Sequence, residues 1–431
     1  MIQAAVIVPP SMDPRLVYDR EANAGYGIVH PAGRISYPPL VSAEVVSMLQ
    51  GYGYSVKVLD LSRVAPYEGL QRIKNLPPVA VAAVNTSLAS WWNDTIFASS
   101  LRKYHPSIKI IAFGNGLTLM PARYRHDIQP YDSVAWGYPL GSLPHILTDS
   151  ITCSLVGCER LQTPPNWGAF CLDEYSFLSI ESSSGCHFGC EWCPYPVVQG
   201  EYVRLKDMRL LKTELTTIAE HASKGTILQF RDPLFPCSRE RMEAIFSLIS
   251  LVLPAHIAVG VETRVEYLDE DVIRDASEAG IRNINLGIES GDPFMLSATK
   301  PGIGSMMDAV TYLQRANRVM QDCLEYGIRP FAMFLLGLPG ESEQSLQATV
   351  DFAKSLPDEI GRQASLFIPI PGTKIYKKLG SLADSALSSV LRGRRRAGDP
   401  IAGVCDVSIQ TLADAKEQID SPGNPRSAIP K

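Results

Sequence analysis

The chain has 431 residues, of which 45% are hydrophobic and 20% are charged, and its formal net charge is -5. This composition is typical of a globular protein long enough for two domains, and it excludes a disordered chain. A modest negative charge gives no general attraction to nucleic acid or to an anionic membrane surface, so we expect neither as a partner.

The sequence predicts neither a membrane span nor an export signal. The longest apolar stretches, residues 247–254 and 331–338, are far below the ~20 residues that cross a bilayer. The start MIQAAVIV lacks the basic segment and cleavage site of a signal peptide, and it predicts a buried strand. We therefore expect a cytoplasmic protein that keeps its cysteines as thiols.

Over residues 1–150, apolar strand-like runs alternate with amphipathic helical stretches. Helices are predicted at 41–49 and 96–104, and strands at 4–8, 55–59, 79–84, 108–113 and 133–136. Strict alternation predicts an α/β domain, with a Rossmann-like parallel sheet whose ligands lie at the carboxyl ends of the strands. Thr86, Gly114 and Gly137 follow three of these strands and leave room for a large ligand, although glycine also simply ends strands.

Residues 151–174, which include Thr163-Pro164-Pro165-Asn166, are interpreted as a linker, and the alternation resumes over residues 175–380. Six strands are predicted there, at 177–180, 226–231, 258–262, 283–288, 332–336 and 363–367, with amphipathic helices at 209–221 and 238–251 among the segments between them. Six such units predict a partial (β/α)6 barrel, open enough for a bulky substrate, with its site at the carboxyl ends of the strands.

Residues 381–431 form a C-terminal extension of different character. We expect part of it to fold back as a helix and its end to be disordered. Its arginine cluster, Arg392, Arg394, Arg395 and Arg396, is interpreted as a solvated surface in preference to a phosphate site.

Three cysteines, Cys186, Cys190 and Cys193, stand in one short loop after the first of these strands. Three thiolates can hold three irons of a cubane cluster and leave the fourth iron open to an exogenous chelator. A zinc site with His187 as fourth ligand is the alternative, and a disulfide framework is a weaker one. Six further cysteines are expected to serve packing or no specific role: Cys153, Cys158, Cys171, Cys237, Cys323 and Cys405.

This C-x3-C-x2-C spacing resembles the cluster motif of the radical SAM superfamily, in which the free iron of a 4Fe-4S cluster binds S-adenosylmethionine. Four later segments resemble the same family in the expected order: FRDPLF at 230–235, NLGIESG at 285–291, FLLGLPGE at 334–341 and IPIPGT at 368–373. The resemblance implies reductive cleavage of the cofactor to a 5′-deoxyadenosyl radical.

The same resemblance implies candidate residues for binding this cofactor. Phe188 or Trp192 would pack beside the adenine, and Arg264 would bind the methionyl carboxylate or pair with an acidic neighbour. Glu289 would accept hydrogen bonds from ribose hydroxyls, and backbone groups around Gly337 and Gly340 would pair with adenine or methionine atoms.

Four residues are candidates for handling protons at the substrate, and each has a structural role as its alternative. They are Asp232, Glu262 and Tyr267, together with Tyr202.

Residues 1–150 loosely resemble the cobalamin-binding domain that precedes the barrel in one radical SAM class, notably through Ile35-Ser36-Tyr37-Pro38-Pro39-Leu40. The resemblance implies that Thr86, Gly114 and Gly137 border the corrinoid. Two loops depart from the family pattern: Gly114-Asn115 replaces a double glycine, and Gly137-Tyr138-Pro139-Leu140 replaces a Gly-Glu-Gly-Glu element.

Three functions remain open at this point. The first is cobalamin-dependent methylation of an unactivated carbon of a small-molecule substrate, such as a natural product, with electrons from a donor such as flavodoxin or ferredoxin. The second is dehydration or rearrangement of a sugar or similar metabolite by a barrel whose N-terminal domain has lost its corrinoid. The third is a non-catalytic iron-sulfur scaffold.

Overall fold

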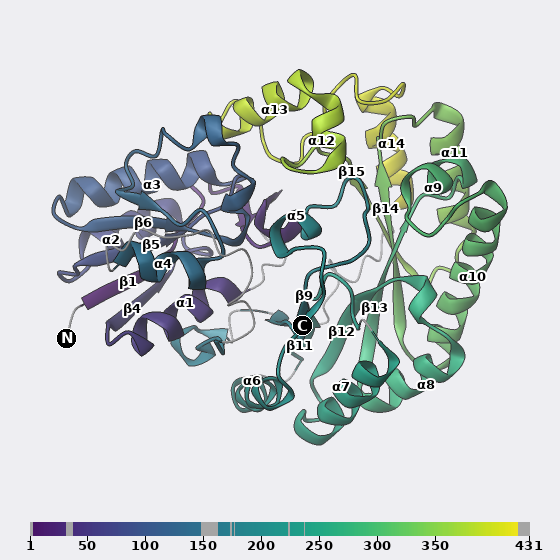
Figure 1. The fold of residues 1–431 in the computed structure, drawn as a ribbon, viewed down its shortest axis with the longest axis horizontal. Coiled ribbons are helices and arrows are strands. Elements are labelled where there is room, and N and C mark those ends of the chain that lie inside the picture. Colours follow the sequence, from purple (N-terminus) through teal and green to yellow (C-terminus); the bar gives the residue numbers. More distant parts are fainter. Residues whose placement is uncertain are drawn as a thin grey trace.

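The computed structural model describes residues 3–31, 38–147, 163–172, 175, 177–222, 225–236 and 238–420. The described residues form two parallel sheets with their helices, followed by helices that reach both parts (Figure 1). Parts of the sequence predictions lie outside the described residues: residues 35–37, most of the predicted linker, Cys153, Cys158, Cys237 and everything after residue 420.

The N-terminal sheet has five parallel strands in the order β4-β1-β5-β6-β7. Their bounds are β1 Gln3–Val8, β4 Ser55–Asp60, β5 Val81–Asn85, β6 Lys109–Phe113 and β7 Ser133–Val134. Alternate residues of β1 pack into two different cores, as the period of two in a strand requires. The predicted parallel sheet with helices on both faces is therefore confirmed.

Two helices cover each face of this sheet. Helices α1 (Leu40–Gly51) and α4 (Pro139–Leu147) contribute to one core, and α2 (Pro66–Lys74) and α3 (Trp91–Tyr104) contribute to the other. Helix α3 begins five residues earlier than predicted, and the Asp94 carboxylate in its first turn is buried against Arg20.

A hairpin between β1 and α1 was not predicted. Its strands are β2 (Leu16–Asp19) and β3 (Ile28–Pro31), which pair antiparallel. Arg20 donates two hydrogen bonds to the carboxylate of Asp94 on α3, Nη2 to Oδ1 at 2.5 Å and Nε to Oδ2 at 3.0 Å. This buried, bidentate ion pair anchors the hairpin to the sheet domain.

The second sheet has six parallel strands in the order β8-β11-β12-β13-β14-β15, which confirms the six-stranded barrel. The strands are β8 Phe177–Ile180, β11 Ile227–Phe230, β12 Ala258–Thr263, β13 Ile281–Glu289, β14 Arg329–Leu336 and β15 Gly361–Leu366. The longer helices between them are α6 Met208–His221, α7 Arg239–Val252, α8 Glu270–Ala279, α9 Pro293–Thr299, α10 Met306–Glu325 and α11 Glu343–Ser355.

Each of these six helices begins at a residue whose side chain accepts a hydrogen bond from the first turn. The capping residues are Asp207, Ser238, Asp269, Asp292, Ser305 and Ser342. Such caps satisfy backbone N–H groups that have no partner inside the helix. They set where each helix starts, and so how far each loop at the carboxyl ends of the strands extends. We call these strand ends and their loops the barrel mouth.

The C-terminal extension contains the helices α13 (Ser381–Leu391) and α14 (Ile409–Ile419), after the short helix α12 (Lys374–Leu379). Ala383, Leu387 and Val390 of α13 pack into the core of the N-terminal domain. Helix α14 lies against β15 and α11 at the outer edge of the barrel. Figure 1 shows α12 and α13 spanning the space between the two sheets. Among the described residues, no helix has the length and apolar character needed to cross a membrane.

Candidate functional site

Residues 181–205, here called the cysteine loop, carry Cys186, Cys190 and Cys193 after the first barrel strand. Cys186 is buried, the other two are half-buried, and all three are free thiols. Burial raises the pKa of the Cys186, Cys190 and Cys193 thiols, while the Arg264 guanidinium acts in the opposite direction on Cys186 and Cys190. Three uncommitted sulfurs therefore share one short loop at the barrel mouth.

The loop is folded tightly back on itself at Gly185. This residue has φ +83°, and a Cβ atom there would lie 2.1 Å from the carbonyl oxygen of Tyr202. Its N–H donates to Gln199 Oε1 at 3.0 Å, and the N–H of Cys186 donates to the Gly200 oxygen at 3.1 Å. Only glycine fits such a close approach with positive φ.

In the described part of the chain, no three His, Cys, Asp or Glu side chains are gathered as ligands of a single metal ion. Cysteines of a cubane cluster each bind a different iron, so they do not need to converge on one point. His187 is exposed, and its ring centroid lies 4.4 Å from that of Phe188.

Arg264 directly follows β12, and its side chain contacts the cysteine loop. Its guanidinium carbon lies 3.8 Å from the centroid of the Phe188 ring. One nitrogen, Nη2, donates to Glu266 Oε1 at 2.6 Å and to the Pro301 oxygen at 2.8 Å. The Nε atom is buried and has no hydrogen-bond partner. An unsatisfied cationic donor at this position favours an anionic ligand that is not part of the protein.

Glu289 ends β13 in an unusual backbone conformation, with φ +74°. Burial raises the pKa of its carboxyl, and Lys300 partly offsets this. A Cβ atom on Gly287 would lie 2.6 Å from Glu289 Oε1, so the carboxylate folds back over this glycine. The sequence predicted Glu289 as a site residue but gave no signal for Lys300, which lies on a different element.

Asp232 binds the start of the cysteine loop. Its carboxylate accepts hydrogen bonds from the Ser182 N–H and hydroxyl at 3.0 Å and 2.9 Å, and from the Ser183 hydroxyl at 2.6 Å. Burial raises its pKa to about 6 despite these donors. The structure thus gives Asp232 a positioning contact, while its predicted role in proton handling stays a prediction.

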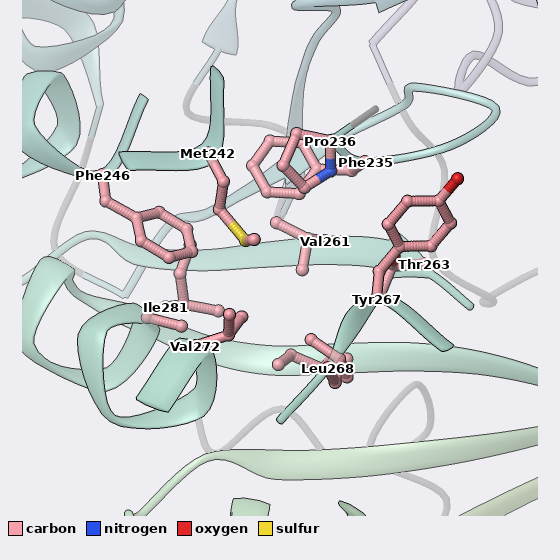
Figure 2. Close-up of a pocket in the computed structure, with 12 residues that line it drawn as sticks. Phe235, Pro236, Met242, Phe246, Val261, Thr263, Tyr267, Leu268, Val272 and Ile281 are labelled. Atoms are coloured by element: carbon pink, nitrogen blue, oxygen red, sulfur yellow. The ribbon is translucent and has the colours of Figure 1, made fainter. Parts of the chain in front are cut away.

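The other proton-handling candidates differ in their exposure to solvent. Glu262 is exposed at the end of β12, and Tyr202 is 83% exposed on the cysteine loop. Tyr267 is half-buried, with its ring edge-on to Phe188 at 6.4 Å between centroids. Figure 2 shows Tyr267 and Thr263 at one end of a small apolar pocket, whose other lining residues include Met242 and Phe246 of α7, Val272 of α8 and Val261 of β12. This pocket lies between the sheet and its helices and suits no polar cofactor.

Trp192 and Gly337 are engaged by neighbouring residues. Trp192 packs against a small core of Met295, Leu338, Phe367 and Ile375. The Gly337 N–H donates to the Glu341 carboxylate. Burial raises the pKa of Glu341 to about 7. Gly340 has φ +91° and no protein atom near its Cβ position, so of these residues it is the one that leaves space at the barrel mouth.

The carboxyl edge of the N-terminal sheet carries the predicted corrinoid-contacting residues. Thr86 is fully buried after β5, and a Cβ atom on Gly114 would lie 2.0 Å from its carbonyl oxygen. The Asn115 side-chain oxygen is buried without a hydrogen-bond partner, whereas the Thr86 hydroxyl faces the side chain of the buried Tyr131. The unpartnered Asn115 oxygen fits a polar ligand at this edge. A Cβ atom on Gly137 would have one neighbour within 4 Å, the Cβ atom of Ser142 at 3.8 Å, which is an ordinary van der Waals contact.

Comparison with known proteins agrees with this geometry. Residues 180–353 match the model of the Radical SAM superfamily. A bacteriochlorophyllide d C-12(1)-methyltransferase of Chlorobaculum tepidum is 24% identical over 225 residues, 50% of this chain and 47% of that protein. The anaerobic magnesium-protoporphyrin IX monomethyl ester cyclase of Rubrivivax gelatinosus is 23% identical over 304 residues, 66% and 52% of the two chains. The chain spans about half the length of these curated relatives.

Two solved structures share the fold over nearly the whole chain. The radical S-adenosylmethionine methyltransferase TsrM of Kitasatospora setae, with cobalamin and a [4Fe-4S] cluster bound, has a TM-score of 0.65 at 15% identity, covering 97% of this chain and 82% of that one. The cobalamin-dependent radical enzyme OxsB, with aqua-cobalamin and S-adenosylmethionine bound, has a TM-score of 0.59 at 12% identity, covering 94% and 58%. The match over residues 180–353 gives the chain a radical SAM domain, and the chain shares the fold of these cobalamin-dependent radical SAM enzymes.

Proposed function

We propose that the protein is a radical SAM enzyme that holds a 4Fe-4S cluster through Cys186, Cys190 and Cys193. With S-adenosylmethionine bound at its open iron, the cluster supplies a 5′-deoxyadenosyl radical, which abstracts hydrogen from carbon as no side chain can. The electron would come from a donor such as flavodoxin or ferredoxin. The protein's own task is to bind, orient and shield the reacting groups.

The observation that carries this proposal is the unpartnered Nε of Arg264 beside the cysteine loop. A carboxylate is the ligand that such a donor prefers, and a charge-assisted hydrogen bond would relieve the cost of its burial. The methionyl carboxylate of S-adenosylmethionine would lie within reach of the cysteines, because Arg264 also stacks on Phe188 of the same loop.

Other residues at the barrel mouth would complete the nucleotide site. The carboxylate of Glu289 would accept hydrogen bonds from the ribose hydroxyls. Gly340 would let the nucleotide approach the backbone, whereas the N–H of Gly337 is already bound by Glu341. Asp232 would keep the cysteine loop in place through Ser182 and Ser183.

We further propose that the N-terminal domain binds cobalamin and that the reaction is methylation of an unactivated carbon of a small molecule. Two observations support this: the unpartnered side-chain oxygen of Asn115 at the carboxyl edge of the sheet, and the methyltransferase names of several relatives. The bound corrinoid would supply the methyl group.

The test uses anaerobically reconstituted protein, hydroxocobalamin, a chemical reductant and S-adenosylmethionine with a deuterated methyl group. We expect corrinoid absorbance to remain after gel filtration, deuterium to appear in the corrinoid fraction and 5′-deoxyadenosine to form. Formation of 5′-deoxyadenosine without any retained corrinoid would instead support the dehydratase or rearrangement function. An intact cluster with neither product would favour the non-catalytic scaffold.

A further inference from the structure

β13 ends in an irregular segment at the barrel mouth. Its pairing with β14 shifts register between Gly287 and Glu289, so that three residues of β13 span two of β14. Such a bulge redirects the side chain that follows it. Here the redirected residue is Glu289, whose positive φ is costly for a residue other than glycine and persists only if neighbouring contacts hold it.

Two side chains from outside the strand donate hydrogen bonds to the same atom of this bulge, the Gly287 carbonyl oxygen. Lys300, just after α9, donates from Nζ to the Gly287 carbonyl oxygen at 2.6 Å. Tyr312 of α10 donates from its hydroxyl to the same oxygen at 3.0 Å. The Gly287 carbonyl is therefore fixed from two helices that follow it in the chain.

Lys300 is placed too deeply to be an ordinary surface lysine. Only 3% of the residue is exposed, and the nearest carboxylate oxygen, Glu289 Oε1, lies 3.9 Å from Nζ. Burial lowers the pKa of Lys300, and Glu289 opposes this shift. The ammonium also lies 5.2 Å from the ring centroid of Tyr312. A buried ammonium that contacts a backbone carbonyl and faces one carboxylate can orient that carboxylate.

We propose that Lys300 is a positioning residue that holds Glu289 in the orientation needed to bind the ribose of S-adenosylmethionine. Its hydrogen bond to Gly287 fixes the bulge, and its charge attracts the Glu289 carboxylate toward the barrel mouth. This inference rests on the proposed function and names the residue on which its ribose contact depends.

The test measures S-adenosylmethionine binding by the reconstituted, cluster-containing enzyme through the change in the electron paramagnetic resonance signal of the reduced cluster. The variants are Lys300→Met, Glu289→Gln, the double variant and Tyr312→Phe. Lys212→Met serves as control, because Lys212 is an exposed residue of α6 and is not among the residues of the proposed nucleotide site. Thermal unfolding is recorded for every variant.

We expect Lys300→Met to weaken binding about tenfold or more, as loss of a partner that orients a ligating group commonly does. Glu289→Gln should weaken it to a similar extent, and the double variant should be no worse than either single change, since both act on one contact. Tyr312→Phe should weaken S-adenosylmethionine binding about threefold, because it removes one hydrogen bond. Lys212→Met should bind like the wild type.

Two results would overturn the inference while leaving the proposed function intact. One is wild-type affinity in Lys300→Met, or in Tyr312→Phe if Lys300→Met does not fold. The other is additive losses in the double variant, which would make Lys300 independent of Glu289. If the wild-type cluster itself gives no response to S-adenosylmethionine, the proposed function fails and the inference fails with it.

Discussion

Gly185 and Tyr202 approach so closely that a single added methyl group on Gly185 would overlap the Tyr202 carbonyl oxygen. The φ of +83° adds strain for any other residue. We predict that Gly185→Ala destabilises the cysteine loop by about 2–3 kcal/mol and lowers the iron content after reconstitution. Gly225→Ala is a matched control, because Gly225 has φ +92° but open space around it. Equal iron content and stability in the two variants would contradict this account.

The cysteines can be tested separately from the rest of the site. Replacing Cys186, Cys190 or Cys193 by alanine should each remove most of the bound iron and sulfide, because a cubane with two protein ligands is held poorly. Cys171→Ser is the control, since Cys171 is exposed and lies outside the loop. Iron and sulfide assays with Mössbauer spectra provide the readout. Retention of a full cluster in any of the three variants would remove that residue from the ligand set.

Arg264 should affect nucleotide binding more than folding. Arg264→Met keeps much of the side-chain volume but removes the unpartnered Nε and the charge over Phe188. We predict that it weakens S-adenosylmethionine binding about tenfold or more, with the cluster retained. Arg264→Lys should restore little of the affinity, because lysine lacks the planar donor. The measurement is a binding isotherm on reconstituted protein, and wild-type affinity in Arg264→Met would refute the carboxylate contact.

The buried carboxyl of Glu341 gives a pH dependence. Burial raises its pKa from 4.5 to about 7 in the folded protein. Between these values the folded state binds more protons than the unfolded state, so this group's contribution to stability is full below about pH 4.5 and is lost as the pH rises through 7. Its full contribution to the free energy of unfolding is about 3 kcal/mol. Glu341→Gln keeps an acceptor for the Gly337 N–H and should remove this dependence. Melting temperatures of both proteins across the range provide the test, and parallel curves would contradict it.

Asp420 contributes to the outer edge of the barrel. Its Oδ1 accepts from the Ala364 N–H of β15 at 2.8 Å, and Lys416 donates to the Ala364 oxygen at 2.7 Å. Asp420→Ala should cost about 1–3 kcal/mol, because it leaves a strand amide without its partner. Asp414→Ala on the same helix is the control, since Asp414 accepts only from the exposed Gln410. A denaturation midpoint unchanged in Asp420→Ala would argue against this role.

The fold was predictable because its two sheets depend on local patterns. Continuous apolar runs such as Ala4 to Val8, and the capped helices after each barrel strand, are visible in the sequence itself. The hairpin at 16–31 was missed because its anchor, Arg20 on Asp94, joins residues 74 positions apart. From the local sequence, charged side chains such as these are predicted to be exposed. Nothing in either segment indicates that they are buried together.

The candidate site divides in the same way. The three cysteines lie in one short sequence motif and Glu289 lies in another, so each could be predicted as a site residue from its own motif. Lys300 was missed because its contact with Gly287 depends on how α9 returns to the strand end, which no spacing rule encodes. Phe188 or Trp192 was predicted beside the adenine, but whether Trp192 packs on a small core or on a nucleotide is decided by the position of α12 and the loop before it.

The position of α14 affects how the protein is made as well as how it holds together. Domains generally fold in the order in which they are synthesised. The outer edge of β15 is then complete before its covering helix has been translated, and a bare strand edge readily pairs with another chain. The nascent polypeptide therefore exposes this strand edge until α14 has been translated and has packed against β15.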